Sequence, residues 1–127
     1  LLTWMHENRA DYTNTFCFLM NKLKNKDQIY ANQQFLNWKK RWESRRKLFS
    51  NLPENSIKIM KKANPLVIPR NHKVEEALTA STKNNDLTKI DELLKILKNP
   101  YENDHEISSY QQPPEPGAEK YKTFCGT

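Results

Sequence analysis

The spacing of the apolar residues constrains this chain most, because it follows the period of an α-helix almost throughout. Large apolar side chains recur every three or four residues between positions 12 and 23, and again between 35 and 49. A residue advances about 100° around an α-helix, so this spacing gathers the apolar side chains on one stripe. No segment alternates apolar and polar residues with the period of two that a half-buried strand needs. The sequence therefore predicts an all-α fold.

We expect a small bundle of four to six short helices. Asp11 or Thr13 is expected to cap the helix that starts near residue 12, and Asn71 is expected to cap the one that follows the proline-containing segment 64–69. The predicted core consists of the side chains on the apolar stripes: Phe16, Leu19, Phe35, Trp38, Trp42, Met60, Ala77, Leu78, Leu94 and Leu97.

The composition changes near residue 99, which divides the expected organisation in two. Residues 1–98 are predicted to form the helical domain. Residues 99–127 contain prolines at positions 100, 113, 114 and 116 and show little periodicity. Proline cannot donate a backbone hydrogen bond and disfavours helix in the residue before it. We therefore expect an extended C-terminal tail over the surface, with one helical turn near residues 106–110.

Glycine is scarce, and this excludes a class of chemistry. The only two glycines, Gly117 and Gly126, lie in the expected tail. A loop that cradles phosphate groups needs several glycines between a strand and a helix, and no such loop can be written here. The glycine-rich, His-Arg-Asp and Asp-Phe-Gly motifs of protein kinases are also missing. We therefore expect no cofactor-binding and no catalytic residues in this chain.

Three further features concern the compartment and the extent of the chain. No signal peptide is recognisable, and no apolar run approaches the ~18 residues of a membrane span. Two cysteines give no disulfide framework of the secreted kind, so a cytoplasmic location is expected. The first residues already follow a helical apolar pattern without an initiator methionine, which indicates a piece of a longer protein.

The formal net charge is +6, and Lys and Arg are distributed along the chain. Residues 38–47, WKKRWESRRK, combine basic and aromatic side chains as nucleic-acid-binding segments do. On a helix, however, Trp38 and Trp42 fall on the core stripe, and the basic residues are scattered around the remaining surface. A solvated helix with buried tryptophans is therefore favoured. A basic helical module that binds nucleic acid, or an adaptor without activity, remains the alternative.

The histidines predict no metal site. His6, His72 and His105 are far apart in the sequence, and neither cysteine has a partner at metal-ligand spacing. A structural zinc site needs about four nitrogen or sulfur ligands. His72, near an expected helix start, has no nucleophile or carboxylate partner that would indicate a general base.

The two cysteines differ in setting. Cys17 lies beside the apolar stripe of its helix and is expected to be a half-buried, inert thiol. Cys125 is third from the end of the chain, in the expected tail, with Lys120 and Lys122 nearby. A mobile thiol near positive charge can be partly thiolate and therefore redox-reactive. The other interpretation, an idle surface cysteine, is equally compatible with the composition.

A set of motifs in a fixed order resembles the C-terminal region of the selenoprotein O family, whose bacterial members include YdiU. The resemblance covers nearly the whole chain, and the pairing of NPLVIPRNH with a terminal TFCGT is its most specific part. The motifs are ADYTNTF (10–16), the tryptophans at 38 and 42, NPLVIPRNHKVEEAL (64–78), NPY (99–101), YQQPP (110–114) and TFCGT (123–127).

The resemblance implies a function for the longer protein. Members are pseudokinase-like enzymes that transfer AMP from ATP to Ser, Thr or Tyr hydroxyls of proteins, and ATP and Mg²⁺ or Mn²⁺ bind in an N-terminal kinase-like core. The resemblance therefore implies that this chain supports the core, is inactive alone, and has that core and the parent's protein substrates as partners. It places the protein in the bacterial cytoplasm, or in mitochondria for a eukaryotic member. It also implies a redox-regulatory role for Cys125, through a disulfide with a cysteine of the core.

Overall fold

The computed structural model describes residues 1–23, 28–49, 53–102, 106–115 and 117. Within these residues the chain forms seven α-helices, one 3-10 turn and no strand, which confirms the all-α prediction. The short α1 and α7 bring the number of helices above the expected four to six. The elements are α1 (Leu2–Glu7), α2 (Tyr12–Leu19), η1 (Gln28–Ala31), α3 (Gln33–Phe49), α4 (Pro53–Ala63), α5 (Asn71–Asn84), α6 (Thr88–Leu97) and α7 (Ser108–Gln111).

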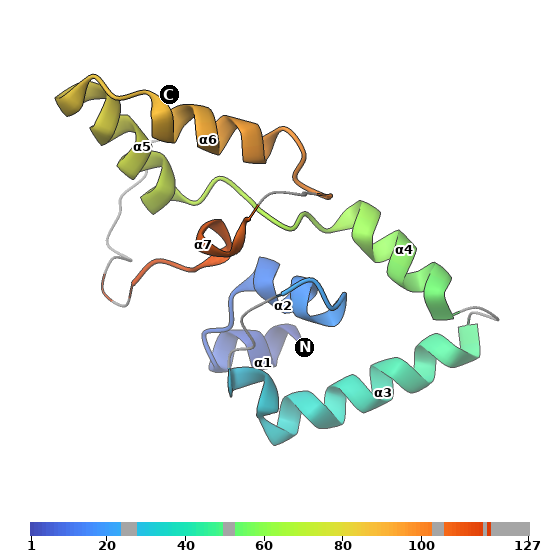
Figure 1. Cartoon of the computed structure of the whole chain (residues 1–127). Coiled ribbons are helices and arrows are strands. Elements are labelled where there is room, and N and C mark those ends of the chain that lie inside the picture. Colours follow the sequence, from blue (N-terminus) through green and yellow to red (C-terminus); the bar gives the residue numbers. More distant parts are fainter. Residues whose placement is uncertain (24–27, 50–52, 103–105, 116, 118–127) are drawn as a thin grey trace, which may run out of the picture.

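Two helix pairs flank a centre made of shorter elements (Figure 1). Helices α3 and α4 form an open V at one side of the molecule, which we call the α3–α4 arm. Helices α5 and α6 lie antiparallel to each other at the opposite side. Between the two pairs lie α1, α2, α7 and residues 64–70, which connect α4 to α5. Segments from both ends of the sequence therefore meet at the centre.

An aromatic cluster joins the base of the arm to α1 and α2. The Phe35 side chain is fully buried, and its ring centroid lies 4.6 Å from that of Trp4. Phe18 stacks on Tyr30 with centroids 4.2 Å apart. Large aromatic side chains remove much apolar surface from water, and tilted or stacked pairs add a further ~0.5–1.5 kcal/mol. This cluster holds α3 in place at its N-terminal end.

A second, smaller apolar cluster lies on the other side of α2. Its buried members come from four segments of the chain: Cys17, Met20, Leu66, Val67, Ile96 and Ile107. Residues 64–70 form no helix, yet Leu66 and Val67 are buried because the two prolines keep this segment extended between α2 and α6. The cluster connects the N-terminal helices to the α5–α6 pair.

The predicted core is correct in part. Leu19, Phe35 and Ala77 are buried, whereas Phe16, Trp38, Trp42, Met60 and Leu97 are only partly buried. The prediction is wrong for Leu78 and Leu94, which are 47% and 52% exposed. Apolar residues cover so much of the circumference of α6 that its period does not identify the inner face. The inner face of α6 is instead set by contact with the second apolar cluster, which buries Ile96. Leu93 is buried on the same side of the helix.

The first part of the expected tail packs against the helical domain. Ile107 is 7% exposed and Gln111 is 4% exposed, and α7 provides the helical turn expected near residues 106–110. The Leu66 backbone N–H donates to the Pro100 carbonyl at 2.6 Å. The expected boundary at residues 98–99 stays a prediction, and residues 118–127, including Cys125, lie outside the described part.

Candidate functional site

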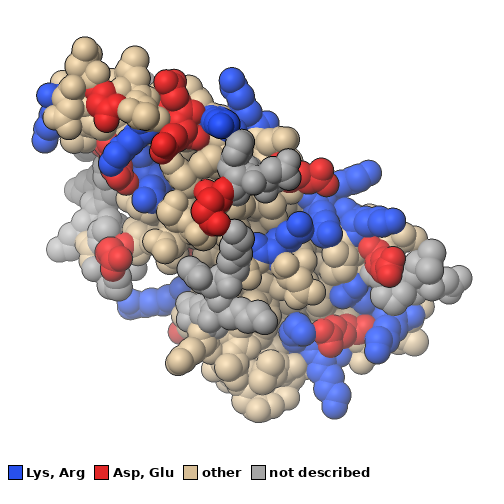
Figure 2. Space-filling model, viewed as in Figure 1, with Lys and Arg blue, Asp and Glu red and all other residues tan. Residues whose placement is uncertain are grey.

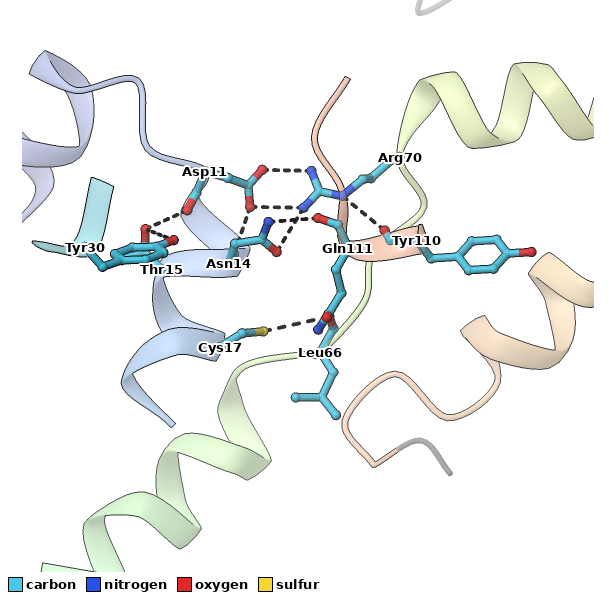
Figure 3. Close-up of polar contacts among 9 residues, drawn as sticks. All are labelled: Asp11, Asn14, Thr15, Cys17, Tyr30, Leu66, Arg70, Tyr110 and Gln111. Carbon is cyan, nitrogen blue, oxygen red and sulfur yellow. Dashed lines mark hydrogen bonds and ion pairs between the residues drawn. The ribbon is translucent and has the colours of Figure 1, made fainter. Parts of the chain in front are cut away.

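Arg70 is the centre of a polar cluster at the meeting point of α2, α5 and α7 (Figure 3). Its guanidinium donates two hydrogen bonds to the Asp11 carboxylate, from Nη1 at 2.8 Å and from Nη2 at 3.0 Å. Nε donates to the Tyr110 carbonyl at 3.2 Å. The Arg70 side chain is only 7% exposed. A paired arrangement of this kind is the strong form of a charged hydrogen bond.

Asn14 and Gln111 complete the cluster, which we call the polar clamp (Asp11, Asn14, Arg70 and Gln111). The Asn14 amide donates to the Gln111 carbonyl at 2.8 Å, and its side-chain oxygen accepts from Arg70 at 3.3 Å. The Gln111 side-chain amide donates to the Leu66 carbonyl at 3.0 Å. Within the described residues, no buried side-chain nitrogen or oxygen lacks a hydrogen-bond partner. The clamp is therefore a fully satisfied network.

Local sequence rules explain two of its positions. Asp11 is the N-cap of α2, as one of the two sequence predictions had it, and it accepts from the Asn14 N–H at 2.8 Å. Asn14 lies one turn into the helix and so faces the same side. The N-cap of α5 is Arg70, whereas Asn71 is the first helical residue, so the predicted cap was one position late. Arg70 follows Pro69, and its extended backbone directs the side chain back toward α2.

The clamp sets the ionisation of its neighbours. Burial by itself raises the pKa of Asp11, but the hydrogen bonds and charge of Arg70 and the Asn14 and Thr13 N–H groups outweigh it and lower the pKa below 3.8. Asp11 is therefore ionised at neutral pH. Burial, and then the Asp11 charge, raises the pKa of the Cys17 thiol to about 11.

Cys17 is more deeply buried than expected. Its thiol is fully buried and lies 3.6 Å from the Pro65 carbonyl and 3.8 Å from the Leu66 carbonyl, positions in which the S–H donates weakly. The thiolate is the nucleophilic form, and a pKa near 11 keeps its population small at neutral pH. The expectation of an inert thiol agrees with this environment.

A cavity of about 350 Å³ adjoins the clamp. Its lining includes Asp11, Asn14, Leu23, Tyr30 and Pro113. Three of its lining residues, Asp11, Asn14 and Tyr30, have polar groups that already bond to neighbouring residues of the chain (Figure 3). Among the described residues that line the cavity, no hydrogen bond pairs a nucleophile with a general base.

The other predicted positions do not converge on a site. His6 is exposed on α1, and His72 lies at the start of α5. Burial, followed by the nearby Lys73 and Arg70 charges, lowers the pKa of His72, which favours the neutral imidazole at pH 7. Cys125 and His105 lie outside the described residues. In the part of the chain that the structure describes, no three His, Cys, Asp or Glu side chains gather as metal ligands would.

Arg70 was not predicted from the sequence to be part of a site. Its signal was local: an arginine directly after the last proline of NPLVIPRNH, at the start of a helix. The partner in space, Asp11, lies 59 residues earlier, and no helical period connects the two.

None of the helices that the structure describes is both long enough and apolar enough to cross a membrane.

The chain matches protein nucleotidyltransferases over its whole length. It is 49% identical over 127 residues to the protein nucleotidyltransferase YdiU of Pelagibacter ubique. It is 41% identical over the same 127 residues to proteins of that name in Bacillus mycoides and Nitrosococcus oceani. All 127 residues are covered, which amounts to 26% of the length of each relative. No family model matches the chain, and no solved structure matches it.

These matches agree with the resemblance read from the motifs, but they give no support to the expected place at the C-terminal end, which stays a prediction. The matched region covers all 127 residues, and the identity of 41–49% over that length is far above chance. Over all of its residues the chain is therefore homologous to proteins named protein nucleotidyltransferase YdiU, and it spans about a quarter of the length of each.

Proposed function

We propose that this chain is a helical supporting segment of a protein nucleotidyltransferase, and that the rest of the longer protein forms the catalytic core. The observation that carries the proposal is the identity to YdiU proteins over all 127 residues. The polar clamp supports it, because buried and mutually bonded groups give a rigid scaffold. Rigid supporting elements hold catalytic groups in position when those groups lie on another part of a protein.

The longer protein is proposed to transfer AMP from ATP to Ser, Thr or Tyr hydroxyls of other proteins. AMP as the transferred group and the hydroxyl acceptors come from the family resemblance, and the relatives' name, protein nucleotidyltransferase, supports the transfer of a nucleotidyl group to a protein. ATP and Mg²⁺ or Mn²⁺ are assigned to the kinase-like core, because this chain has no glycine-rich phosphate loop. The core of the same protein and the parent's protein substrates are the proposed partners. The proposed location is the bacterial cytoplasm, because the relatives are bacterial proteins.

A pair of deletion and point variants tests the supporting role. The full-length protein is compared with a form that lacks this segment, and AMP transfer to a protein acceptor is measured with labelled ATP. Deletion should abolish transfer, and the 127-residue chain alone should show none. In full-length protein, Arg70→Met should reduce transfer through lost support, whereas Lys83→Met on the exposed surface of α5 should not. Full activity of the deleted form would refute the supporting role.

The position of the segment within the longer protein is a separate part of the proposal. We propose the C-terminal end, on the strength of the motif order and the TFCGT motif alone. The coding sequence on either side of this chain tests it directly. A kinase-like reading frame upstream of Leu1 and a stop codon after Thr127 would support this placement. A kinase-like frame that follows Thr127 would contradict it.

Cys125 is proposed to form a reversible disulfide with a cysteine of the core and to restrain the active site when oxidised. Exposed or strained disulfides are readily reduced in the cytosol, which suits regulation. Cys125→Ser in the full-length protein should remove the response of AMP transfer to dithiothreitol and oxidant. Cys17→Ala provides the matched control, because the buried Cys17 should leave that response unchanged. An unchanged response in Cys125→Ser would place the switch elsewhere.

A further inference from the structure

Positive charge is concentrated in the α3–α4 arm, whereas the sequence had been interpreted as carrying its excess charge spread along the chain. Residues 33–63 contain nine Lys and Arg and two Glu, a formal net charge of +7, although the whole chain carries +6. Figure 2 shows more blue than red side chains over the side of the molecule where α3 and α4 lie. A concentration of one sign costs self-repulsion unless an opposite charge lies against it.

Most of these charges have no partner within the described residues. Lys39 pairs with Glu43 at 2.7 Å, and Arg46 lies over the Trp42 ring at 4.5 Å. The structure gives no ion pair, within the part of the chain that it describes, for six others: Lys40, Arg41, Lys47, Lys58, Lys61 and Lys62. On the α5–α6 pair, by contrast, Lys73 and Lys89 both bond to Glu76.

Exposed aliphatic side chains share the surface with these charges. Leu48 is 83% exposed on α3, and Ile59 is 67% exposed on α4. Leu48 lies seven residues after Arg41, and Ile59 lies three residues before Lys62, so each pair shares one side of its helix. A protein interface has an apolar core and a polar rim, and exposed apolar groups bordered by charges are compatible with that arrangement.

The aromatic residues of the arm argue against a nucleic-acid surface. Bases bind single-stranded sites by stacking on exposed aromatic rings. Here Trp38 stacks on Trp42 with ring centroids 5.9 Å apart. The Phe35 ring also stacks on Trp38, at 6.1 Å, and the Arg46 guanidinium lies over Trp42. The rings are therefore occupied by neighbours within the chain.

We propose that the α3–α4 arm docks against an acidic surface formed by the rest of the longer protein. The inference rests on the proposed function, because it takes the remaining length of a YdiU-type protein as the partner. That length is available: the chain spans 26% of its relatives. The uncompensated charge of the arm favours a partner with acidic side chains opposite it, and Leu48 and Ile59 supply apolar surface for the same contact.

Cross-linking of the full-length protein tests the contact without any measurement of activity. A carbodiimide joins lysine amines to carboxylates that they touch, and peptide mass spectrometry identifies the partners. Lys40, Lys58 and Lys62 should link to Asp or Glu outside this chain with a several-fold higher yield than Lys83, Lys95 and Lys98. The latter three are the matched exposed lysines of the α5–α6 pair. The yield should fall in about 1 M salt, where the Debye length is about 3 Å.

Matched variants sharpen the test. Arg41→Gln/Lys58→Gln/Lys62→Gln and Lys83→Gln/Lys95→Gln/Lys98→Gln remove the same charge from the arm and from the α5–α6 pair. Only the arm variant should lower the melting temperature of the full-length protein, and high salt should shrink the difference. Equal yields and equal melting temperatures would overturn the proposal. Cross-links between isotope-labelled and unlabelled copies would also overturn it, because the partner would then be a second molecule. Oligonucleotide binding that is lost only in the arm variant would overturn it in favour of a nucleic-acid surface. Failure of the supporting role would instead appear as full activity after deletion of the segment.

Discussion

In the polar clamp, charged groups are mostly buried and are paired, whereas in the α3–α4 arm they are mostly exposed and six of them have no ion pair among the described residues. Arg70 donates two hydrogen bonds to Asp11, and both residues lie among further donors and acceptors. The arm places nine basic residues around two helices with two acidic ones. Buried pairs fix a fold, and exposed unpaired charges are available to a partner. The comparison assigns stability to the clamp and recognition to the arm.

The largest effect is expected when the clamp loses its cation. Arg70→Met keeps apolar length but leaves the half-buried Asp11 carboxylate without its counter-charge, and it removes a donor from the Tyr110 carbonyl. Breaking a buried pair from one side costs about 3–5 kcal/mol of unfolding free energy. Urea unfolding followed by tryptophan fluorescence measures it. A loss no larger than that of Lys83→Met would show that the clamp does not hold the fold.

A smaller loss is expected from the far end of the clamp. In Gln111→Ala the Leu66 carbonyl loses its 3.0 Å amide donor in a buried setting. An unsatisfied buried acceptor costs about 1–3 kcal/mol. Gln112→Ala, at the exposed neighbouring position, is the control and should unfold like the parent. Equal stabilities of the two variants would mean that α7 is not anchored through Gln111.

The clamp should also respond to acid. The folded state holds the pKa of Asp11 below 3.8, so its contribution is complete above that pH and is lost as the pH falls through the lowered value. Stability measured by urea unfolding should therefore decline below about pH 4. Asp11→Asn should be less stable at neutral pH and should lose part of this decline. A decline of the same size in both proteins would exclude Asp11 as its source.

The smallest effect on folding is expected in the arm. Arg41→Gln removes an exposed charge that has no ion pair within the described residues, so unfolding of the 127-residue chain should change by less than about 0.5 kcal/mol. Relief of repulsion favours a small gain. A loss above 1 kcal/mol would show that the arm uses its charge within the chain, and it would weaken the comparison.

The sequence predicted the local features well and the long-range ones poorly. The helical period located the helices, and short-range capping chemistry identified Asp11 as one of two candidate caps, because both depend on residues three or four positions apart. Arg70 and Gln111 were missed because their partners lie 59 and 97 residues away along the chain. The wrong burial of Leu94 has the same origin, since contacts outside α6 decide which side faces inward.

The bond between Asn14 and the Gln111 carbonyl has a consequence for how the molecule forms. It joins residues 97 positions apart, and Ile107 completes an apolar cluster that includes Cys17. Contacts of such sequence separation form late, because a long loop must close before they contribute. During synthesis, α2 therefore leaves the ribosome well before its partner in α7 exists. A chain that stops before residue 107 would keep its helices but expose the apolar side of α2, which favours aggregation and degradation.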